Sequence, residues 1–195
     1  MGIQGTARVS NNNARQPGNS EWATEMREKL TEEFDISHVT ESVFATVNQL
    51  HENISLLSKD LETSGRQGKK TLLVVCYRGG GGLDMRCLET YAIMQGGKAF
   101  PIEHLLRDLA KIQNCYVLGV LDCPRLRLET QIFDGYNFKD EEAKNLILMF
   151  GCKMMQNLKQ SCTLPLFDLL ARKRESEKRK FVTLPEELLF IEAVK

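Results

Sequence analysis

Two continuous apolar runs, separated by one amphipathic stretch, constrain the fold of this chain more than any other feature. Thr71–Cys76 and Tyr116–Leu121 show no alternation of polar and apolar residues, which is typical of strands buried on both faces of a parallel sheet. Between them, after Pro101, apolar residues recur at the spacing of one helix face as far as Ile112. The sequence therefore predicts a βαβ unit, in which two adjacent parallel strands are crossed by a helix over residues 101–112.

The rest of the chain supplies further elements of an α/β domain. Helical spacing of apolar residues, short apolar runs and glycine pairs indicate where they lie. The expected elements are a short helix around Trp22–Leu30, a helix from Val39 to Leu61, a chain break at Gly79–Gly82, a hairpin around Gly96-Gly97, a third core strand at Leu146–Phe150, a helix from Leu164 to about Ser176, and closing segments at Phe181–Leu184 and Leu188–Val194.

The first 20 residues are polar, rich in Asn and Gly, and nearly free of large apolar groups. Such a segment cannot offset the entropy lost on ordering, so residues 1–20 are expected to be a disordered tail before a domain over residues 21–195. The opening Met-Gly-Ile-Gln-Gly-Thr fits the pattern for N-myristoylation of Gly2. One acyl chain gives only weak, reversible membrane attachment.

Charge and cysteine spacing argue against several kinds of protein. Lys plus Arg and Asp plus Glu number 26 each, so no global field favours nucleic acid or an anionic membrane. No apolar run approaches the roughly 18 residues of a membrane span, and the N-terminus lacks a secretory signal. We therefore expect a cytoplasmic protein with reduced thiols, no metal and no cofactor. The cysteines, which form no CxxC pair and do not cluster with His38, His51 or His104, are Cys76, Cys87, Cys115, Cys123, Cys152 and Cys162.

Candidate chemistry lies where the two buried strands end, because ligands and catalytic groups gather beyond the carboxyl ends of parallel strands. The first end is Cys76-Tyr77-Arg78-Gly79-Gly80, and the second is Asp122-Cys123-Pro124-Arg125. The glycine run lacks the spacing of a phosphate-binding loop. A thiol nucleophile at Cys123 is the other candidate, since backbone N–H groups at a strand end can face a developing oxyanion.

The order of these segments resembles the caspase and metacaspase group of cysteine proteases. In that family a buried strand ends in Ser-His-Gly, a hairpin and helix follow, and a second strand ends in the nucleophile motif about 50 residues later. Here Leu-Leu-Val-Val-Cys-Tyr-Arg78-Gly79 resembles the first strand, and Tyr116-Val-Leu-Gly-Val-Leu-Asp-Cys123-Pro-Arg resembles the second. The resemblance covers about residues 39–190 and implies a three-layer α/β/α sandwich with a mostly parallel sheet.

The chain departs from the family at the catalytic positions. Arg78 stands at the position of the catalytic histidine, 45 residues before Cys123. A guanidinium is never deprotonated in proteins, so Arg78 cannot act as a general base. By the same resemblance the N–H groups of Gly79 and Cys123 are the oxyanion donors, and a match shifted by one residue would place Pro124 at the nucleophile position. No candidate for the family's first strand precedes residue 39, so the sheet is expected to be short or completed by another chain.

The resemblance therefore implies a catalytically inactive caspase-like domain that acts as a protein-interaction or regulatory module. Its partner would be a protein, either a second copy of this chain or a related caspase-like chain, because the family's sheets pair through their last strand. Two alternatives stay open. One is an active cysteine endopeptidase that uses Cys123, and the other is a structural subunit of a larger assembly.

Overall fold

The computed structural model describes residues 4–11, 19–32, 38–42, 47–94, 97–128, 143–157, 165–169 and 171–172. The chain forms two units, Met1–Thr163 and Leu164–Lys195, and every element named below lies in the first. In the second unit, residues 165–169 and 171–172 are helical, as the helix expected from Leu164 requires. The closing segments expected at Phe181–Leu184 and Leu188–Val194 lie outside the described residues.

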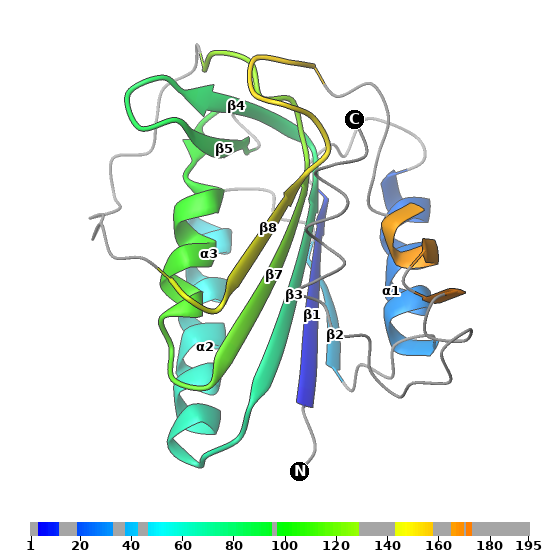
Figure 1. Ribbon diagram of the computed structural model, residues 1–195, viewed down its shortest axis with the longest axis vertical. Helices are drawn as coiled ribbons and strands as arrows, with labels where there is room; N and C mark the ends of the chain where they lie inside the picture. The colour runs from blue at the N-terminus through cyan, green and yellow to red at the C-terminus, as the bar shows by residue number, and fades with distance from the viewer. Residues whose placement is uncertain are drawn as a thin grey trace. The chain divides into compact units, whose positions relative to one another are not determined.

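Within the described residues, the first unit is built around a five-stranded parallel sheet (Figure 1). The strand order is β2-β1-β3-β7-β8, and every neighbouring pair is parallel. The two buried runs are adjacent, because β3 pairs with β7 from Thr71 and Cys115 to Arg78 and Asp122. The predicted α/β class and the predicted parallel pair are confirmed. The strands are β1 (Gln4–Asn11), β2 (His38–Ser42), β3 (Thr71–Arg78), β7 (Cys115–Asp122) and β8 (Leu146–Phe150).

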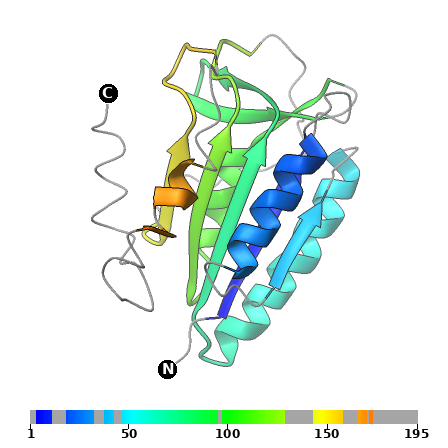
Figure 2. The same ribbon diagram turned by 90° about the vertical axis from the view of Figure 1, so that its right-hand side faces the viewer.

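Helices cover both faces of this sheet. Helix α1 (Asn19–Glu32) packs against β1 and β2 and lies in front of the strands in Figure 2. Helices α2 (Val47–Arg66) and α3 (Ile102–Ala110) lie on the opposite face (Figure 1), and α3 packs against β7 as predicted. No helix in the described ranges combines the length and apolar character that a membrane span requires.

Alternate residues of the central strands point to opposite helical layers, as the period of a strand demands. Leu73 and Tyr77 of β3 belong to the buried apolar cluster that α2 and α3 form with the sheet. Val74 and Cys76 are equally buried but lie outside that cluster, on the face that carries α1. This alternation extends through β7 and decides on which face each candidate residue lies.

A small antiparallel sheet follows β3, with β4 (Gly80–Asp84), β5 (Glu89–Ile93) and β6 (Ala99–Phe100) in that order. The predicted hairpin is confirmed in its flanking strands, since Ala92 pairs with Phe100. The expected chain break at Gly79–Gly82 is wrong, because the last three of these glycines belong to β4. Their role is close approach, since a Cβ on Gly81 would lie 2.7 Å from the sulfur of Cys123.

The expectation of a disordered tail over residues 1–20 is wrong for two segments. Gln4–Asn11 forms β1, which pairs in parallel with both β2 and β3, and Asn19 begins α1. Composition does not reveal such a strand, because two neighbouring strands satisfy its backbone groups whatever side chains it carries. The described sheet therefore has a strand before residue 39 that comes from this chain.

The helix expected from Val39 begins later. His38–Ser42 forms β2, and α2 starts at Val47. The segment contains β-branched residues that suit a strand, and pairing with β1 provides the hydrogen bonds that a helix turn would otherwise make. The apolar face predicted for the rest of the helix is confirmed, since its buried residues are Leu50, Ile54, Leu57 and Leu61.

Candidate functional site

Strands β3 and β7 end side by side, and their last residues form what we call the carboxyl edge (Arg78–Gly81 and Asp122–Arg125). Arg78 and Asp122 are direct partners in the parallel register. The backbone N–H of Gly79 donates a hydrogen bond to the carbonyl oxygen of Asp122, with a nitrogen–oxygen distance of 3.2 Å. The structure thus brings together the two strand ends at which the sequence predicted candidate chemistry.

Cys123 follows β7 directly and is fully buried. Its side chain belongs to the apolar cluster beneath α2 and α3 and packs against the backbone of Gly81 in β4. Burial raises the pKa of the Cys123 thiol from 9.0 to about 12, and the neighbouring Cys152 thiol and Asp122 carboxylate act in the same direction. The charge of Arg125 opposes this shift but does not reverse it. The sulfur is therefore a protonated core group near neutral pH.

Arg78 is the last residue of β3 and is half-buried on the other face of the sheet. Strand alternation places it with Val74 and Cys76, toward α1. Its guanidinium carbon lies 5.9 Å from the ring centre of Trp22 on α1, within the range of a cation–π contact. The Arg78 guanidinium and the Cys123 sulfur therefore lie on opposite faces of the sheet.

This arrangement limits what the carboxyl edge can do chemically. The guanidinium of Arg78 cannot accept a proton, and the sheet lies between this group and the thiol of Cys123. The N–H of Gly79 is already bonded to Asp122, so it would have to leave that bond before it could hold a substrate oxyanion. Buried Asp122 lies in register with Arg78 and alternates with Cys123, which places it on the α1 face.

Pro124, the alternative residue at the nucleophile position, is half-buried after Cys123. Its carbonyl oxygen lies 2.9 Å from the point where a Cβ on Gly81 would sit. A proline side chain has no group that can attack a carbonyl carbon. Gly2, the predicted acylation site, lies outside the described residues.

Arg125 is a buried residue of the carboxyl edge for which the sequence held no separate signal. Its Nε donates to the hydroxyl oxygen of Thr90 on β5 at 3.1 Å, and its guanidinium carbon lies 3.8 Å from the ring centre of Phe150 on β8. Its backbone N–H and carbonyl bond to Gln156 and Met155 in the segment after β8. Arg125 therefore joins the loop after β7 to two neighbouring parts of the fold.

Sequence reasoning also missed Cys152, which lies beside Cys123. Its thiol donates to the carbonyl oxygen of Cys123 with a sulfur–oxygen distance of 3.3 Å. Their positions in the sequence could have indicated this proximity. Cys123 stands two residues after Leu121 and Cys152 two residues after Phe150, and each of these residues ends an apolar run.

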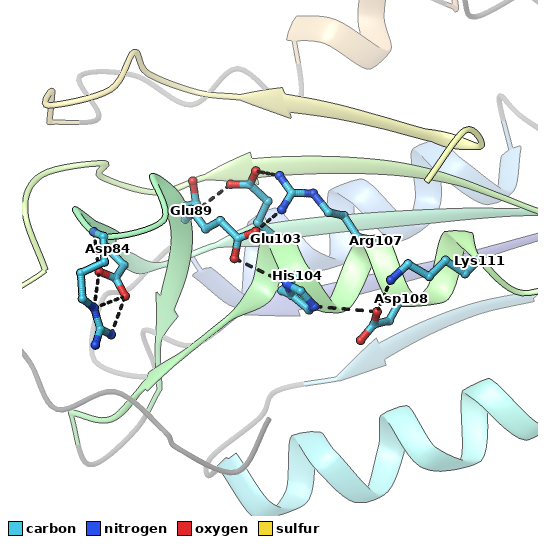
Figure 3. A network of polar contacts seen from close by, with 9 residues as sticks. Asp84, Glu89, Glu103, His104, Arg107, Asp108 and Lys111 are labelled. Carbon is cyan, nitrogen blue, oxygen red and sulfur yellow. Dashed lines mark hydrogen bonds and ion pairs between the residues drawn. The ribbon is translucent and has the colours of Figure 1, made fainter. Parts of the chain in front are cut away.

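A second polar cluster joins α3 to β5 (Figure 3). Glu103 accepts hydrogen bonds from the backbone N–H of Thr90 at 2.9 Å and from Arg107, which also pairs with Glu89. The buried ring of His104 faces two carboxylates, with Nδ1 3.6 Å from Glu89 and Nε2 3.8 Å from Asp108. These contacts fix α3 on the small sheet and hold His104 beside carboxylates rather than beside a thiol.

Within the part of the chain that the structure describes, no three His, Cys, Asp or Glu side chains gather in a way that could hold a metal ion. No protein-family model matches the sequence, and no curated protein matches it.

Proposed function

We propose that this chain is a catalytically inactive caspase-like domain that acts as a protein-interaction module. One observation carries the proposal: Cys123 is buried against β4, and Arg78 lies on the opposite face of the sheet. A cysteine peptidase needs a thiolate in contact with both a base and the substrate, and neither residue meets that requirement.

The arrangement of elements supports the caspase-like part of the proposal. A parallel strand, a small antiparallel sheet, a helix and a second parallel strand follow one another from β3 to β7, in the order that the resemblance implies. Helices lie on both faces of the sheet (Figure 1), which suits a three-layer α/β/α sandwich. The strand β1 supplies a first strand for which the sequence had offered no candidate.

The loss of acid–base chemistry supports the catalytically inactive part. General acid–base catalysis is worth roughly 10²–10⁴-fold in rate, and Asp122, the carboxylate of this edge, lies on the α1 face rather than on the face of the Cys123 thiol. The raised pKa of Cys123 further reduces the thiolate fraction near neutral pH.

Exposed apolar side chains near the carboxyl edge support the interaction part. They lie on three segments that hydrogen bonds join, since Leu83 of β4 donates to Leu126, and Met155 donates to Arg125. Methionine adapts its shape to different partners and is frequent at protein-binding surfaces. The side chains, each 38–51% exposed, are Met85, Leu88, Leu126, Met154 and Met155.

Cleavage of a broad peptide library by the purified full chain tests the catalytic half. We expect no cleavage by the wild type, by Cys123→Ala or by Arg78→His, because a histidine at position 78 would still face α1. Wild-type cleavage that Cys123→Ala abolishes would contradict the proposal and establish the endopeptidase alternative. Robust cleavage by Arg78→His alone would show that the two positions can meet across the sheet after all.

Site-specific photo-crosslinking in cells tests the interaction half. A photoreactive residue at position 155 is expected to form discrete crosslinks with a protein, either a second copy or another chain. The matched control is position 56, where Leu56 is 60% exposed and belongs to α2 rather than to the segments around the carboxyl edge. Crosslinks that are absent at position 155, or equal at both positions, would contradict the assigned surface.

A further inference from the structure

Cys123 and Cys152 occupy equivalent positions after two neighbouring parallel strands. β7 and β8 pair in register up to Leu121 and Phe150, and each cysteine follows two residues later. Neighbouring strands lie about 4.8 Å apart, and disulfides form between residues whose Cα atoms are about 4.4–6.8 Å apart. The register therefore brings these two cysteines within bridging range.

The two chain segments stay paired after the strands end. Gly151 donates to the carbonyl oxygen of Leu121 at 3.0 Å, and the thiol of Cys152 donates to the carbonyl oxygen of Cys123 at 3.3 Å. Further along, Arg125 donates to Gln156, and Met155 donates to Arg125. The bonds on both sides of the cysteine pair hold the two backbones together at this point.

The pair also lies on one face of the sheet. Strand register matches Val117 with Leu146 and Leu121 with Phe150, and all four side chains pack in or against the cluster under α2 and α3. Cys123 belongs to the same cluster, and Cys152 continues the same alternation. Their side chains therefore point to the same side, as a bridge between neighbouring strands requires.

We propose that Cys123 and Cys152 form a redox-active pair that a hydroperoxide converts to an intramolecular disulfide. The Cys152 thiolate attacks one peroxide oxygen, the O–O bond breaks, and a sulfenic acid forms as the other oxygen leaves as water. The Cys123 sulfur then attacks the sulfur of Cys152, the S–O bond breaks, and the oxygen leaves with the Cys123 proton as water. Two thiols lose two electrons, and one hydrogen peroxide becomes two waters.

The order of these steps follows from exposure. Cys152 is half-buried and accessible to a small oxidant, whereas Cys123 is fully buried and shielded from one. Burial raises the pKa of the Cys152 thiol, and the backbone N–H and charge of Arg125 act in the opposite direction. The reaction is therefore expected to accelerate with rising pH, as the thiolate fraction of Cys152 grows. This inference does not depend on the proposed function, because it rests on the register of β7 and β8, the hydrogen bonds that follow it and the exposure of the two thiols.

Peptide mapping of the oxidised full chain tests the proposal. Reduced, folded protein is treated with hydrogen peroxide, the remaining thiols are alkylated, and the digest is mapped without reductant. The expected product is a Cys123–Cys152 linked peptide that has lost two hydrogen atoms and that dithiothreitol cleaves. The same treatment in urea is expected to lose this selectivity, because the strand register is then absent.

Two serine variants complete the test. In Cys152→Ser, free Cys123 is expected to disappear at least about tenfold more slowly, because buried Cys123 has lost its partner. In Cys87→Ser, which removes an exposed thiol elsewhere, the linked peptide is expected to form as in the wild type. Over-oxidation of Cys152 without a link to Cys123, or preferential linkage of either cysteine to Cys162 or to another molecule, would overturn the proposal.

Discussion

At the scale of single residues, the close approach of Gly81 to Cys123 determines the environment of the thiol. A Cβ at position 81 would lie 2.7 Å from both the Cβ and the sulfur of Cys123 and 2.9 Å from the carbonyl oxygen of Pro124. The backbone of β4 therefore covers the sulfur directly, and no side chain intervenes. A glycine is required there for space rather than for an unusual backbone angle.

Gly81→Ala is expected to lower the free energy of unfolding by about 1–3 kcal/mol, because the methyl group forces β4 away from Cys123. Gly80→Ala is the matched control, since its Cβ would meet Ile93 at 3.3 Å, a contact that a small shift relieves. We expect less than about 1 kcal/mol there, with part of the cost offset by reduced freedom of the unfolded chain. Urea unfolding measures both values. Equal effects at the two positions would contradict the packing of Cys123 under β4.

Asp84 provides a pH-dependent test at the same scale. Hydrogen bonds from Arg86 hold the pKa of the Asp84 carboxyl below its ordinary value of 3.8. A group with a lowered folded-state pKa stabilises the fold above its ordinary pKa, and this contribution is lost as the pH falls through the folded-state value. Because the Arg86 side chain is 78% exposed, solvent screens the pair and its contribution to stability is small.

The free energy of unfolding of Asp84→Asn should therefore fall below that of the wild type by a constant amount above about pH 5 and converge with it below pH 4. Thermal unfolding between pH 2 and pH 7 measures the difference. A gap that persists unchanged at the lowest pH would mean that the carboxylate charge contributes nothing, and that the substitution acts through packing alone.

At the scale of elements, strand β1 is an interior strand of the parallel sheet. It lies between β2 and β3, so both of its edges pair with backbone. Ala7, in register with Val39 on one side and Val74 on the other, stands near its middle. The strand therefore joins β2 to the rest of the sheet through backbone hydrogen bonds.

Ala7→Pro is expected to lower the free energy of unfolding by at least about 2 kcal/mol, because proline removes a ladder donor from an interior strand and leaves a carbonyl without a partner. Ala7→Ser keeps the N–H group and serves as the control. Unfolding curves for the two variants measure the effect. An Ala7→Pro protein as stable as Ala7→Ser would show that residues 4–11 are the tail that their composition suggests.

The predicted elements and the missed elements differ in whether their own residues or distant parts of the chain determine their structure. β3, β7 and α3 were predictable, because an apolar run and a helical period are properties of the segment itself. β1 and β2 were not, because their structure depends on pairing with distant strands that side-chain pattern does not report. β4 was missed because glycine usually marks a turn, whereas here it permits close packing.

The same distinction applies to the candidate site. Sequence alone placed Arg78 and Cys123 at neighbouring strand ends, which the register of β3 and β7 confirms. The sequence did not indicate on which face of the sheet each residue lies. Arg78 pairs with Asp122, the residue before Cys123, and successive residues of a strand point to opposite faces. The burial of Cys123 and its contact with Cys152 also depend on β4 and β8, which are distant in the sequence.

At the scale of the whole molecule, the sheet separates the two candidate catalytic residues. The α2 and α3 face holds Cys123 in an apolar cluster, and the α1 face holds Arg78 over Trp22. Catalysis would require both groups on one accessible side. Binding to a partner requires neither group, since the exposed apolar side chains near the carboxyl edge lie on the turn between β4 and β5 and on the segments after β7 and β8.

The rate of alkylation of Cys123 in the folded protein shows whether its thiol is a buried core group or a reactive nucleophile. Cys87 is an exposed thiol in the same chain and provides the internal standard. Under pulsed iodoacetamide labelling at pH 8, read out by peptide mass spectrometry, Cys87 is expected to react at least about a hundredfold faster than Cys123. Cys123 is expected to react only when the fold opens, because its sulfur is buried and its thiol pKa is raised to about 12. Labelling of Cys123 as fast as that of Cys87, or faster, would contradict the account, because it would place a reactive nucleophile at the carboxyl edge.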